Sequence, residues 1–288
     1  MLLTNSPQNA QETVLRWKRE SKIAFVPTMG CLHEGHLALI RRAKELGERT
    51  VASIFVNPLQ FGPNEDFEKY PRTFEEDKAK LEAAGVDMLF HPTVKDLYPE
   101  GFATRLQVGE MADRLCGKFR PGHFDGVTTV CLKLFEITQA DFAVFGEKDF
   151  QQLRVIQQMT ADLNLPIRIV ALPTQRDSDG LAMSSRNRYL SNEERSWALK
   201  IPETLRKVRE EVISNGTLKV KDALEIAQEN LAFVPLKVQY AEITEGRNLI
   251  AADRDAYVNG VSLPHFFIAA YAGTTRLIDN ISLNGDHA

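Results

Sequence analysis

Residues 23–36, with the sequence IAFVPTMGCLHEGH, contain the pattern that decides the fold. Residues 23–26 form an apolar run of strand length that leads directly into Pro27. Helical periodicity follows over residues 37–43, and Gly47 supplies a stop signal. A buried strand that passes through a glycine-containing turn into an amphipathic helix is the first half of a βαβ unit.

The same alternation continues along the chain to about residue 175. Further strands are predicted at 50–56, 88–90, 141–145 and 167–172, and further helices at 73–85, 127–134 and 150–162. The helix at 73–85 is expected to open with a capping box formed by Thr73 and Glu76. Right-handed crossovers between such strands build a largely parallel sheet whose carboxyl ends share one edge, where ligands of open α/β sheets bind. The sequence therefore predicts an α/β protein with a Rossmann-like, doubly wound parallel sheet.

The pattern changes after about residue 176. A second capping box at 191–194 precedes helical spacing over 197–208, and another helix is predicted at 220–233. Three β-like runs follow, at 236–243, 264–272 and 275–278. Helices followed by strands indicate a smaller α+β domain. We therefore expect one domain at 1–176 and a smaller carboxyl-terminal domain at 177–288.

Composition excludes several classes of protein. The 288 residues are 43% hydrophobic and 26% charged, which is typical of a globular chain and not of a disordered or disulfide-rich one. The formal net charge of −4 argues against a protein whose main task is nucleic-acid binding. The three cysteines show no C-x-x-C spacing, the start has no signal-peptide pattern, and no run of 18 apolar residues occurs. These features predict a cytoplasmic protein with no nucleic-acid partner and no membrane association.

The turn after the first strand carries the first chemical signal. Gly30 and Gly35 are spaced like the glycines of a P-loop, but His36 stands where that motif needs lysine, so a P-loop NTPase is excluded. A glycine-containing turn at a helix start remains a natural anion site. His33 and His36 are three residues apart and share a helix face, so both could contact phosphate oxygens. A simple capped helix with two solvated histidines is the alternative.

The second signal is the stretch Met183 to Asn187, which follows Asp179 and Gly180. It gathers two hydroxyls, an arginine and main-chain amides in one turn, a composition suited to phosphate. Taken alone, an ordinary serine-rich turn explains it as well. Its pairing with an early His-x-Gly-His loop resembles the nucleotidyl-transferring superfamily that includes class I aminoacyl-tRNA synthetases.

Within that superfamily, the chain resembles the pantoate–β-alanine ligase family. The matching stretches are 26–30 with 32–33 and 35–36, 53–58 with 60–61, 70–73, 120–124, 145–152, 179–182, 183–187 and 276–280. Each is weak alone, but their order along most of the chain is specific. The resemblance implies that ATP and (R)-pantoate form pantoyl adenylate and pyrophosphate, after which β-alanine displaces AMP to give pantothenate.

The resemblance also implies roles for particular residues. It assigns ATP binding to Met29, Gly30, Cys31, Leu32, His33, Glu34, Gly35, His36, Gly146, Glu147, Lys148, Asp149, Gln175, Met183, Ser184, Ser185 and Arg186. Catalytic roles are implied for His36, His33, Lys148 and Arg186, with His36 as the general acid. Pantoate is assigned to Gln60 and Gln152, and β-alanine to Gln60 and Asn57.

Several points stay open at the level of sequence. ATP implies Mg²⁺, held mostly by phosphates and waters; no protein ligand is assigned, and Asp77 is only a guess. Arg120 and His123 lie in a glycine-containing loop that could close over the site. Family resemblance suggests a homodimer. The rival interpretations are another nucleotidyltransferase, acting on a phosphorylated small molecule, and a non-catalytic nucleotide- or RNA-binding module.

Overall fold

The structure is a computed structural model that describes residues 1–63, 65 and 67–284. Its internal contacts divide the chain into two compact units. The first unit comprises Met1–Asp113, Gly117–Glu147 and Gln152–Thr174, and the second comprises Arg114–Cys116, Lys148–Gln151 and Gln175–Ala288. The predicted domain boundary after residue 176 stays a prediction.

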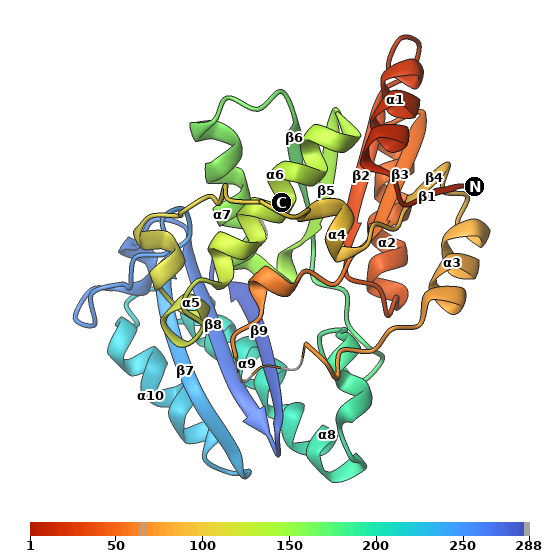
Figure 1. Cartoon of the computed structure of the whole chain (residues 1–288). Coiled ribbons are helices and arrows are strands. Elements are labelled where there is room, and N and C mark those ends of the chain that lie inside the picture. The colour runs from red at the N-terminus through yellow and green to blue at the C-terminus, as the bar shows by residue number, and fades with distance from the viewer. Residues whose placement is uncertain (64, 66, 285–288) are drawn as a thin grey trace. The chain divides into compact units, whose positions relative to one another are not determined.

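The elements are labelled in Figure 1. The strands are β1 (Leu2–Thr4), β2 (Ile23–Thr28), β3 (Arg49–Ile54), β4 (Met88–Phe90), β5 (Phe142–Gly146), β6 (Arg168–Leu172), β7 (Leu236–Glu245), β8 (Pro264–Ala272) and β9 (Thr275–Ser282). The α-helices are α1 (Pro7–Trp17), α2 (Glu34–Leu46), α3 (Phe74–Ala83), α4 (Val94–Leu97), α5 (Cys116–Phe119), α6 (His123–Thr138), α7 (Phe150–Asp162), α8 (Asn192–Ala198), α9 (Lys200–Ser214) and α10 (Val220–Leu231). Short 3-10 segments include η1 (Pro58–Gln60), η3 (Glu147–Asp149) and η4 (Ser185–Tyr189).

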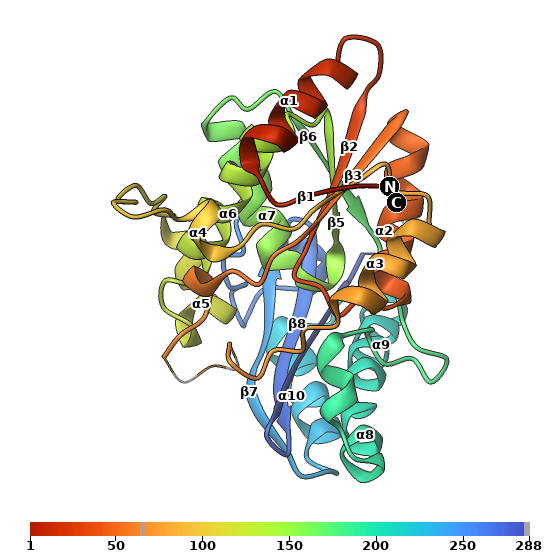
Figure 2. The same ribbon diagram turned by 45° about the vertical axis from the view of Figure 1, so that its right-hand side comes forward.

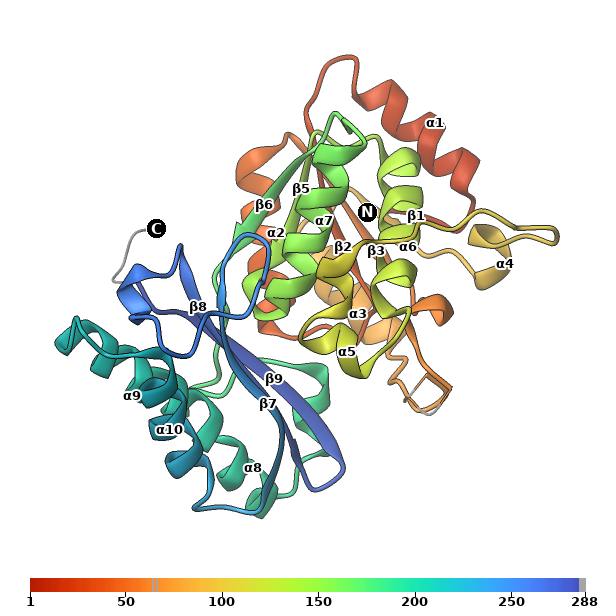
Figure 3. The ribbon, with the colours of Figure 1, turned by 90° about the vertical axis from the view of Figure 1, so that its left-hand side faces the viewer.

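The first unit contains a parallel sheet with the strand order β1-β4-β3-β2-β5-β6. Helices α2 and α3 lie on one face, and α1, α6 and α7 lie on the other (Figure 3). Strands covered on both faces are expected to be apolar throughout, and the residues of β2 from Ile23 to Val26 are fully buried. The α/β, doubly wound fold predicted from the sequence is confirmed.

The direction of winding reverses between β2 and β5, which are neighbours in the sheet. Ligands of open α/β sheets bind outside the carboxyl ends of the strands at such a switch point. β2 ends at Thr28 and leads into the loop before α2, whereas β5 ends at Gly146 and leads into η3. Two of the predicted ATP-binding stretches therefore begin at the switch point.

Helix α6 and the segment η1 touch through their backbones. A Cβ atom on Gly126, in the first turns of α6, would lie 2.2 Å from the carbonyl oxygen of Leu59 and 2.7 Å from the amide nitrogen of Gln60. No real Cβ tolerates such contacts, so only glycine fits there. The close approach fixes the distance between α6 and η1, the segment that carries Gln60.

The second unit contains an antiparallel sheet with the order β7-β8-β9. Helices α9 and α10 cover one face of this sheet, as Figure 2 shows. Its core joins Leu205 and Val208 of α9 with Phe266 and Ile268 of β8, all buried. None of the helices in the described ranges is long and apolar enough to cross a membrane.

Strand β7 contains a β-bulge. Val238 pairs with Ala270 and Tyr240 pairs with Ala269, so Gln239 is an extra residue in the ladder. The Oε1 atom of Gln239 accepts hydrogen bonds from Nε and a terminal nitrogen of Arg276 on β9, at 3.0 and 2.8 Å. The same guanidinium reaches Sγ of Cys116 at 3.5 Å, and the Tyr240 hydroxyl lies 3.0 Å from that sulfur.

The structure corrects three local expectations. The sequence analysis did not predict β1 or α1. A local signal for α1 exists, because Ser6 caps this helix by accepting a hydrogen bond from the Asn9 amide at 3.2 Å. The predicted capping box at Thr73 is wrong, because the Thr73 hydroxyl donates to Asp77 at 3.1 Å instead of capping α3. β9 runs to Ser282 rather than stopping at residue 278. The capping box of Ser191 and Glu194 at the start of α8 is confirmed.

We predict that Gly126→Ala destabilises the protein by about 1–3 kcal/mol, because overpacking against rigid backbone forces η1 and α6 apart. This cost exceeds the gain of roughly 1 kcal/mol that alanine brings to a helix interior. Urea denaturation measures the change. Gly109→Ala is the matched control, since a Cβ there meets no atom within 4 Å. Equal stability of the two variants would contradict the close approach.

Candidate active site

The loop between β2 and α2 has an unusual backbone. Gly30 and Cys31 are consecutive residues with positive φ angles of 82° and 51°. A Cβ on Gly30 would also lie 3.1 Å from Oδ2 of Asp77. Glycine thus serves both the left-handed conformation and the close approach of a side chain. The turn directs the amides of residues 31 and 32 toward α3.

Asp77 on α3 holds this loop. The side chain is buried, and its Oδ2 and Oδ1 atoms accept hydrogen bonds from the amides of Cys31 and Leu32, each at 2.7 Å. One turn along α3, Nζ of Lys80 donates to the Leu32 carbonyl oxygen at 2.7 Å. A carboxylate and an ammonium from one helix therefore fix both polar groups of the Leu32 main chain.

Asp77 does not fit the role of magnesium ligand that the sequence left open for it. Both of its carboxylate oxygens are occupied by main-chain amides, and Thr73 adds a third donor. No group of three or more carboxylate, imidazole or thiol side chains able to hold a metal occurs among the described residues. The described residues therefore do not form a magnesium site built by the protein alone.

His33 and His36 come together at the start of α2, with ring centroids 4.0 Å apart. The amide of His33 lies 3.3 Å from Nδ1 of His36 and can only donate. Nδ1 of His36 must therefore be the unprotonated nitrogen, which places the proton on Nε2. The loop thus selects the tautomer of His36 that can donate a proton from the outer nitrogen.

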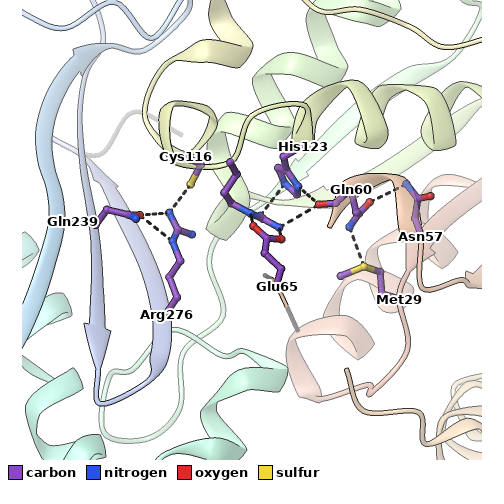
Figure 4. A network of polar contacts seen from close by, with 9 residues as sticks. Met29, Asn57, Gln60, Glu65, Cys116, His123, Gln239 and Arg276 are labelled. Carbon is purple, nitrogen blue, oxygen red and sulfur yellow. Dashed lines mark hydrogen bonds and ion pairs between the residues drawn. The ribbon is translucent and has the colours of Figure 1, made fainter. Parts of the chain in front are cut away.

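Gln60 and Asn57 also come together, at the carboxyl end of β3 (Figure 4). The Oε1 atom of Gln60 accepts a hydrogen bond from Nδ2 of Asn57 at 3.3 Å, and Nε2 of Gln60 donates to Sδ of Met29 at 2.9 Å. A thioether is a weak acceptor, so this Gln60 donor is poorly satisfied and suited to exchange its partner for a ligand oxygen.

Asn57 is fully engaged within the protein. Its Nδ2 also donates to the Gly126 carbonyl oxygen at 3.0 Å, and its Oδ1 accepts from the Tyr98 hydroxyl at 2.9 Å and from the Leu59 amide at 3.3 Å. The side chain is buried, with 1% of its surface exposed. Its contact with β-alanine stays a prediction, and its observed contacts hold η1 and Gln60 in place.

Arg120 and His123 both contact the main-chain carbonyl oxygen of Gln60. Figure 4 shows the contact between His123 and Gln60. Together with Gln60 and Glu65 they line a cavity of about 680 Å³. These residues all belong to the first unit. The loop that the sequence could only describe as glycine-containing is therefore tied to a predicted substrate ligand.

Lys148 belongs to the second unit and is held through its main chain. Its carbonyl oxygen accepts a hydrogen bond from Nδ2 of Asn280 at 2.9 Å, and Oδ1 of Asn280 lies 2.7 Å from Nε2 of His265. The His265 ring stacks on Phe150 with 3.9 Å between centroids. Burial lowers the pKa of His265 to about 4, so the imidazole is neutral at neutral pH and donates to Asn280.

Glu147 precedes Lys148, and burial raises the pKa of its carboxyl group. Asp149 follows, with a carboxylate oxygen 3.9 Å from Nζ of Lys148. Gln151 is occupied with main-chain groups: it accepts from the Cys116 amide at 2.9 Å and donates to the Arg114 carbonyl oxygen at 2.7 Å. Gln152, the predicted pantoate ligand, lies half-buried in the first turn of α7.

The serine-rich loop is ordered by its own turn and by a short antiparallel bridge. The Ser184 hydroxyl caps η4 by accepting from the Arg186 amide at 3.3 Å. The Met183 amide donates to the Gln175 carbonyl oxygen at 2.9 Å. Arg176, beside Gln175, forms an ion pair with buried Asp279 at 2.7 Å. These contacts fix the backbone of the loop that carries Ser184, Ser185 and Arg186.

Sequence reasoning missed Lys80, Asn280 and His265 as supports of the site. The contacts of Lys80 with Leu32 and of Asn280 with Lys148 join residues 48 and 132 positions apart, so no local pattern reveals them. Asp279 and Asn280 lie in 276–280, a stretch that resembles the family. That resemblance could have indicated that these two residues support the site.

Comparisons with known proteins identify relatives of this chain along its whole length. The family model described as pantoate-beta-alanine ligase matches residues 2–282. A pantothenate synthetase of a Sulfurihydrogenibium species is 47% identical over 285 residues, covering 98% of this chain and 99% of the relative. The pantothenate synthetase 1 of Bradyrhizobium diazoefficiens is 50% identical over 265 residues, covering 92% of each chain.

Solved structures show the same similarity. A crystal structure of pantothenate synthetase from Thermus thermophilus has a TM-score of 0.92 and 44% identity, covering 99% of this chain and 100% of the other. A pantoate-beta-alanine ligase from Francisella tularensis, complexed with beta-gamma ATP and beta-alanine, has a TM-score of 0.81 and 36% identity, covering 98% of each chain.

We predict that Asp77→Asn lowers the free energy of unfolding by about 1–3 kcal/mol, because the amide that replaces one carboxylate oxygen cannot accept a bond from the loop. Urea denaturation of the variant and the original protein measures the loss. Asp255→Asn is the control: this exposed carboxylate pairs with Lys221 at 2.8 Å, and its replacement should change stability by less than about 0.5 kcal/mol. A loss no greater than the control's would contradict the role of Asp77.

We predict that His265 makes the protein less stable as pH falls from about 6.5 toward about 4. In that window the unfolded chain binds a proton at residue 265 and the folded chain does not, so acid favours unfolding, by on the order of 3 kcal/mol for the full shift. Above this window the stabilisation is fully present. Denaturation at several pH values should show a shallower slope for His265→Gln, which still offers a donor to Asn280 but does not titrate. Equal slopes would show that the buried imidazole is not responsible.

Proposed function

Because this chain belongs to the pantoate-beta-alanine ligase family, we propose that it condenses (R)-pantoate with β-alanine at the expense of ATP, through a pantoyl adenylate. The observation that carries the proposal is the His33–His36 loop, which is braced by Asp77 and presents a proton donor at the carboxyl edge of β2. A phosphate-binding turn at a helix start suits adenylate chemistry. The Francisella relative, a complex with beta-gamma ATP and beta-alanine, further supports it.

The reaction needs two displacements. In the first, a carboxylate oxygen of pantoate attacks the α-phosphorus of ATP and pyrophosphate leaves. In the second, the amino group of β-alanine attacks the acyl carbon and AMP leaves. A mixed anhydride of pantoate and AMP is needed because a free carboxylate is a poor electrophile, and the anhydride supplies AMP as a good leaving group. The protein's task is to position the reactants and to compensate charge on phosphate oxygens.

The proposed nucleotide ligands have different tasks. His36 donates the proton on its Nε2 atom to a phosphate oxygen as negative charge develops on it, and His33 is a second phosphate ligand. Lys148, Ser184, Ser185 and Arg186 compensate the charge of the remaining phosphate oxygens. Glu34, Gly35, Gly146 and Gln175 are proposed to contact the nucleotide chiefly through their main chains.

Gln60 is the proposed ligand of pantoate, with Gln152 as its partner. The weak bond from Gln60 Nε2 to the Met29 thioether makes an exchange favourable when a carboxylate or hydroxyl oxygen arrives. A neutral amide can serve both groups of a hydroxy acid without adding charge to the site. β-Alanine is proposed to approach Gln60 as well.

Other features of the proposal rest on the family resemblance and on the sequence pattern. ATP brings Mg²⁺ held by its phosphates and by waters, in agreement with the occupied carboxylate of Asp77. A homodimer, a cytoplasmic location, and a nucleotide- and pantoate-binding domain at 1–176 with a smaller domain at 177–288 complete the proposal.

We predict that His36→Ala reduces pantoate-dependent exchange of pyrophosphate into ATP by about 10²–10⁴-fold, the usual contribution of a positioned general acid. Labelled pyrophosphate, ATP and pantoate without β-alanine isolate this first step. Arg42→Gln is the control on the same helix, since it removes only an exposed pair with Glu45. An unchanged rate in His36→Ala would remove His36 from the mechanism.

The same assay, followed by rapid quench with labelled pantoate, tests the proposed reaction itself. Label released from the denatured protein as the mixed anhydride with AMP is the expected result. Label that stays covalently on the protein would refute the adenylate route, and exchange that needs no pantoate would refute the substrate.

A further inference from the structure

The main-chain carbonyl of Gln60 is held by two side chains from the junction of α5 and α6. The Gln60 oxygen lies 2.7 Å from Nδ1 of His123 and 3.3 Å from a terminal nitrogen of Arg120. The other terminal nitrogen of Arg120 lies 3.1 Å from Nε2 of His123. Arg120 and His123 come 60 and 63 positions after Gln60 in the sequence, yet both contact this one oxygen atom. All three residues belong to the first unit.

The donors and acceptors in this network allow one protonation state of His123. A guanidinium has only donors, so the nitrogen that faces Arg120, Nε2, must be unprotonated and accept. A carbonyl oxygen can only accept, so Nδ1 must carry the proton and donate to Gln60. A proton on Nε2 would remove the bond to Arg120 and place two cations 3.1 Å apart. The network is therefore complete only with a neutral imidazole.

Glu65 fixes the guanidinium in turn. Its two carboxylate oxygens accept from Nε and a terminal nitrogen of Arg120 at 2.6 and 2.5 Å, a bidentate pair. The two side chains, Arg120 and Glu65, are 18% and 25% exposed, so water screens the pair only in part. Burial would raise the pKa of Glu65, but the hydrogen bonds and charge of Arg120 outweigh burial and lower it.

Other charged groups lie near His123, and the Glu65 carboxylate is one whose charge interacts with it. Arg105 lines the same cavity, and Asp125, two residues along α6, uses one oxygen to accept from the Val108 amide at 2.9 Å. The Phe124 ring packs edge-on against the imidazole at 4.8 Å. Arg120 is a charged group in direct hydrogen-bond contact with His123.

We infer that Arg120 and His123 are positioning residues that fix where Gln60 presents its amide to pantoate, and that Glu65 orients Arg120 for this purpose. The inference rests on the proposed function, because it takes Gln60 as the pantoate ligand. Gln60 ends η1, a segment of only three residues, so a shift of its carbonyl oxygen also shifts its side chain. The three residues act on the affinity for pantoate through Gln60 and do not touch the reacting atoms.

A double-mutant cycle tests this arrangement. His123→Ala should raise the KM for pantoate by about tenfold, with the KM for ATP changed by less than about twofold, as expected for one lost hydrogen bond. Gln60→Ala should raise the KM for pantoate at least as much. If His123 acts through Gln60, adding His123→Ala to Gln60→Ala should change the KM by less than about twofold more.

Conservative variants separate positioning from a general loss of structure. His123→Asn keeps a donor for the Gln60 carbonyl oxygen and should stay within about threefold of the original KM. Glu65→Gln, on the loop surface, should give a smaller rise of the same kind as His123→Ala. Lys221→Gln removes an exposed ion pair in the second unit and should leave both KM values unchanged.

The pH dependence supplies a readout that a purely structural role would not move. Between about pH 8 and about pH 5, the KM for pantoate should rise more steeply in the original protein than in His123→Asn, which does not titrate. Protonation of pantoate itself contributes equally to both and cancels in the comparison.

The outcomes separate the inference from the proposed function. Independent, multiplicative effects of Gln60→Ala and His123→Ala, or equal rises in both KM values, would overturn the positioning role alone. An unchanged KM for pantoate in Gln60→Ala would remove Gln60 as the pantoate ligand and the inference with it, while pantoate-dependent exchange could still stand.

Discussion

The contact on which the candidate site depends most is the one between the buried Asp77 carboxylate and the amides of Cys31 and Leu32. A left-handed conformation is costly for a non-glycine residue such as Cys31, and it persists only where other contacts fix it. Asp77 offers two charged acceptors at 2.7 Å, and Lys80 fixes the next carbonyl group. Because this loop leads directly into α2, the same contact sets where the helix begins and how His33 and His36 face each other.

The predicted substrate-binding residues of the two units are positioned in the same way. Side chains proposed to bind substrates are placed through the main chain of their own residues, as the carbonyl oxygens of Gln60 and Lys148 demonstrate. These carbonyl contacts position both residues without using the side-chain groups that are proposed to bind ligands. The supporting groups, such as Asn57 and Asn280, have their own hydrogen bonds satisfied inside the protein, so they hold one geometry.

The sequence predicts the fold well where the signal is local. The apolar run of β2, the periodicity of α2 and the stop at Gly47 are read from adjacent residues. The sequence analysis missed β1 because three residues are too few to show an alternating hydrophobic pattern. The strand forms through its pairing with β4, far along the chain. Thr73 was misassigned because a spacing rule cannot tell that a buried carboxylate four residues later offers a better partner. Arg120 and His123 contact the main-chain carbonyl oxygen of Gln60. Every residue has such an oxygen, so residue types alone give no signal for these contacts.

The bulge in β7 places an extra residue, Gln239, where its side chain makes a specific contact with Arg276. Without Gln239, Val238 and Tyr240 would be adjacent residues facing Ala270 and Ala269, so the ladder with β8 would run without interruption. Regular pairing between β7 and β8 therefore does not require Gln239. Its side chain is the one that binds the guanidinium of Arg276, which in turn reaches Cys116. A shorter strand would pair equally well and would leave that arginine without its amide partner, so the extra length serves the side chain and not the sheet.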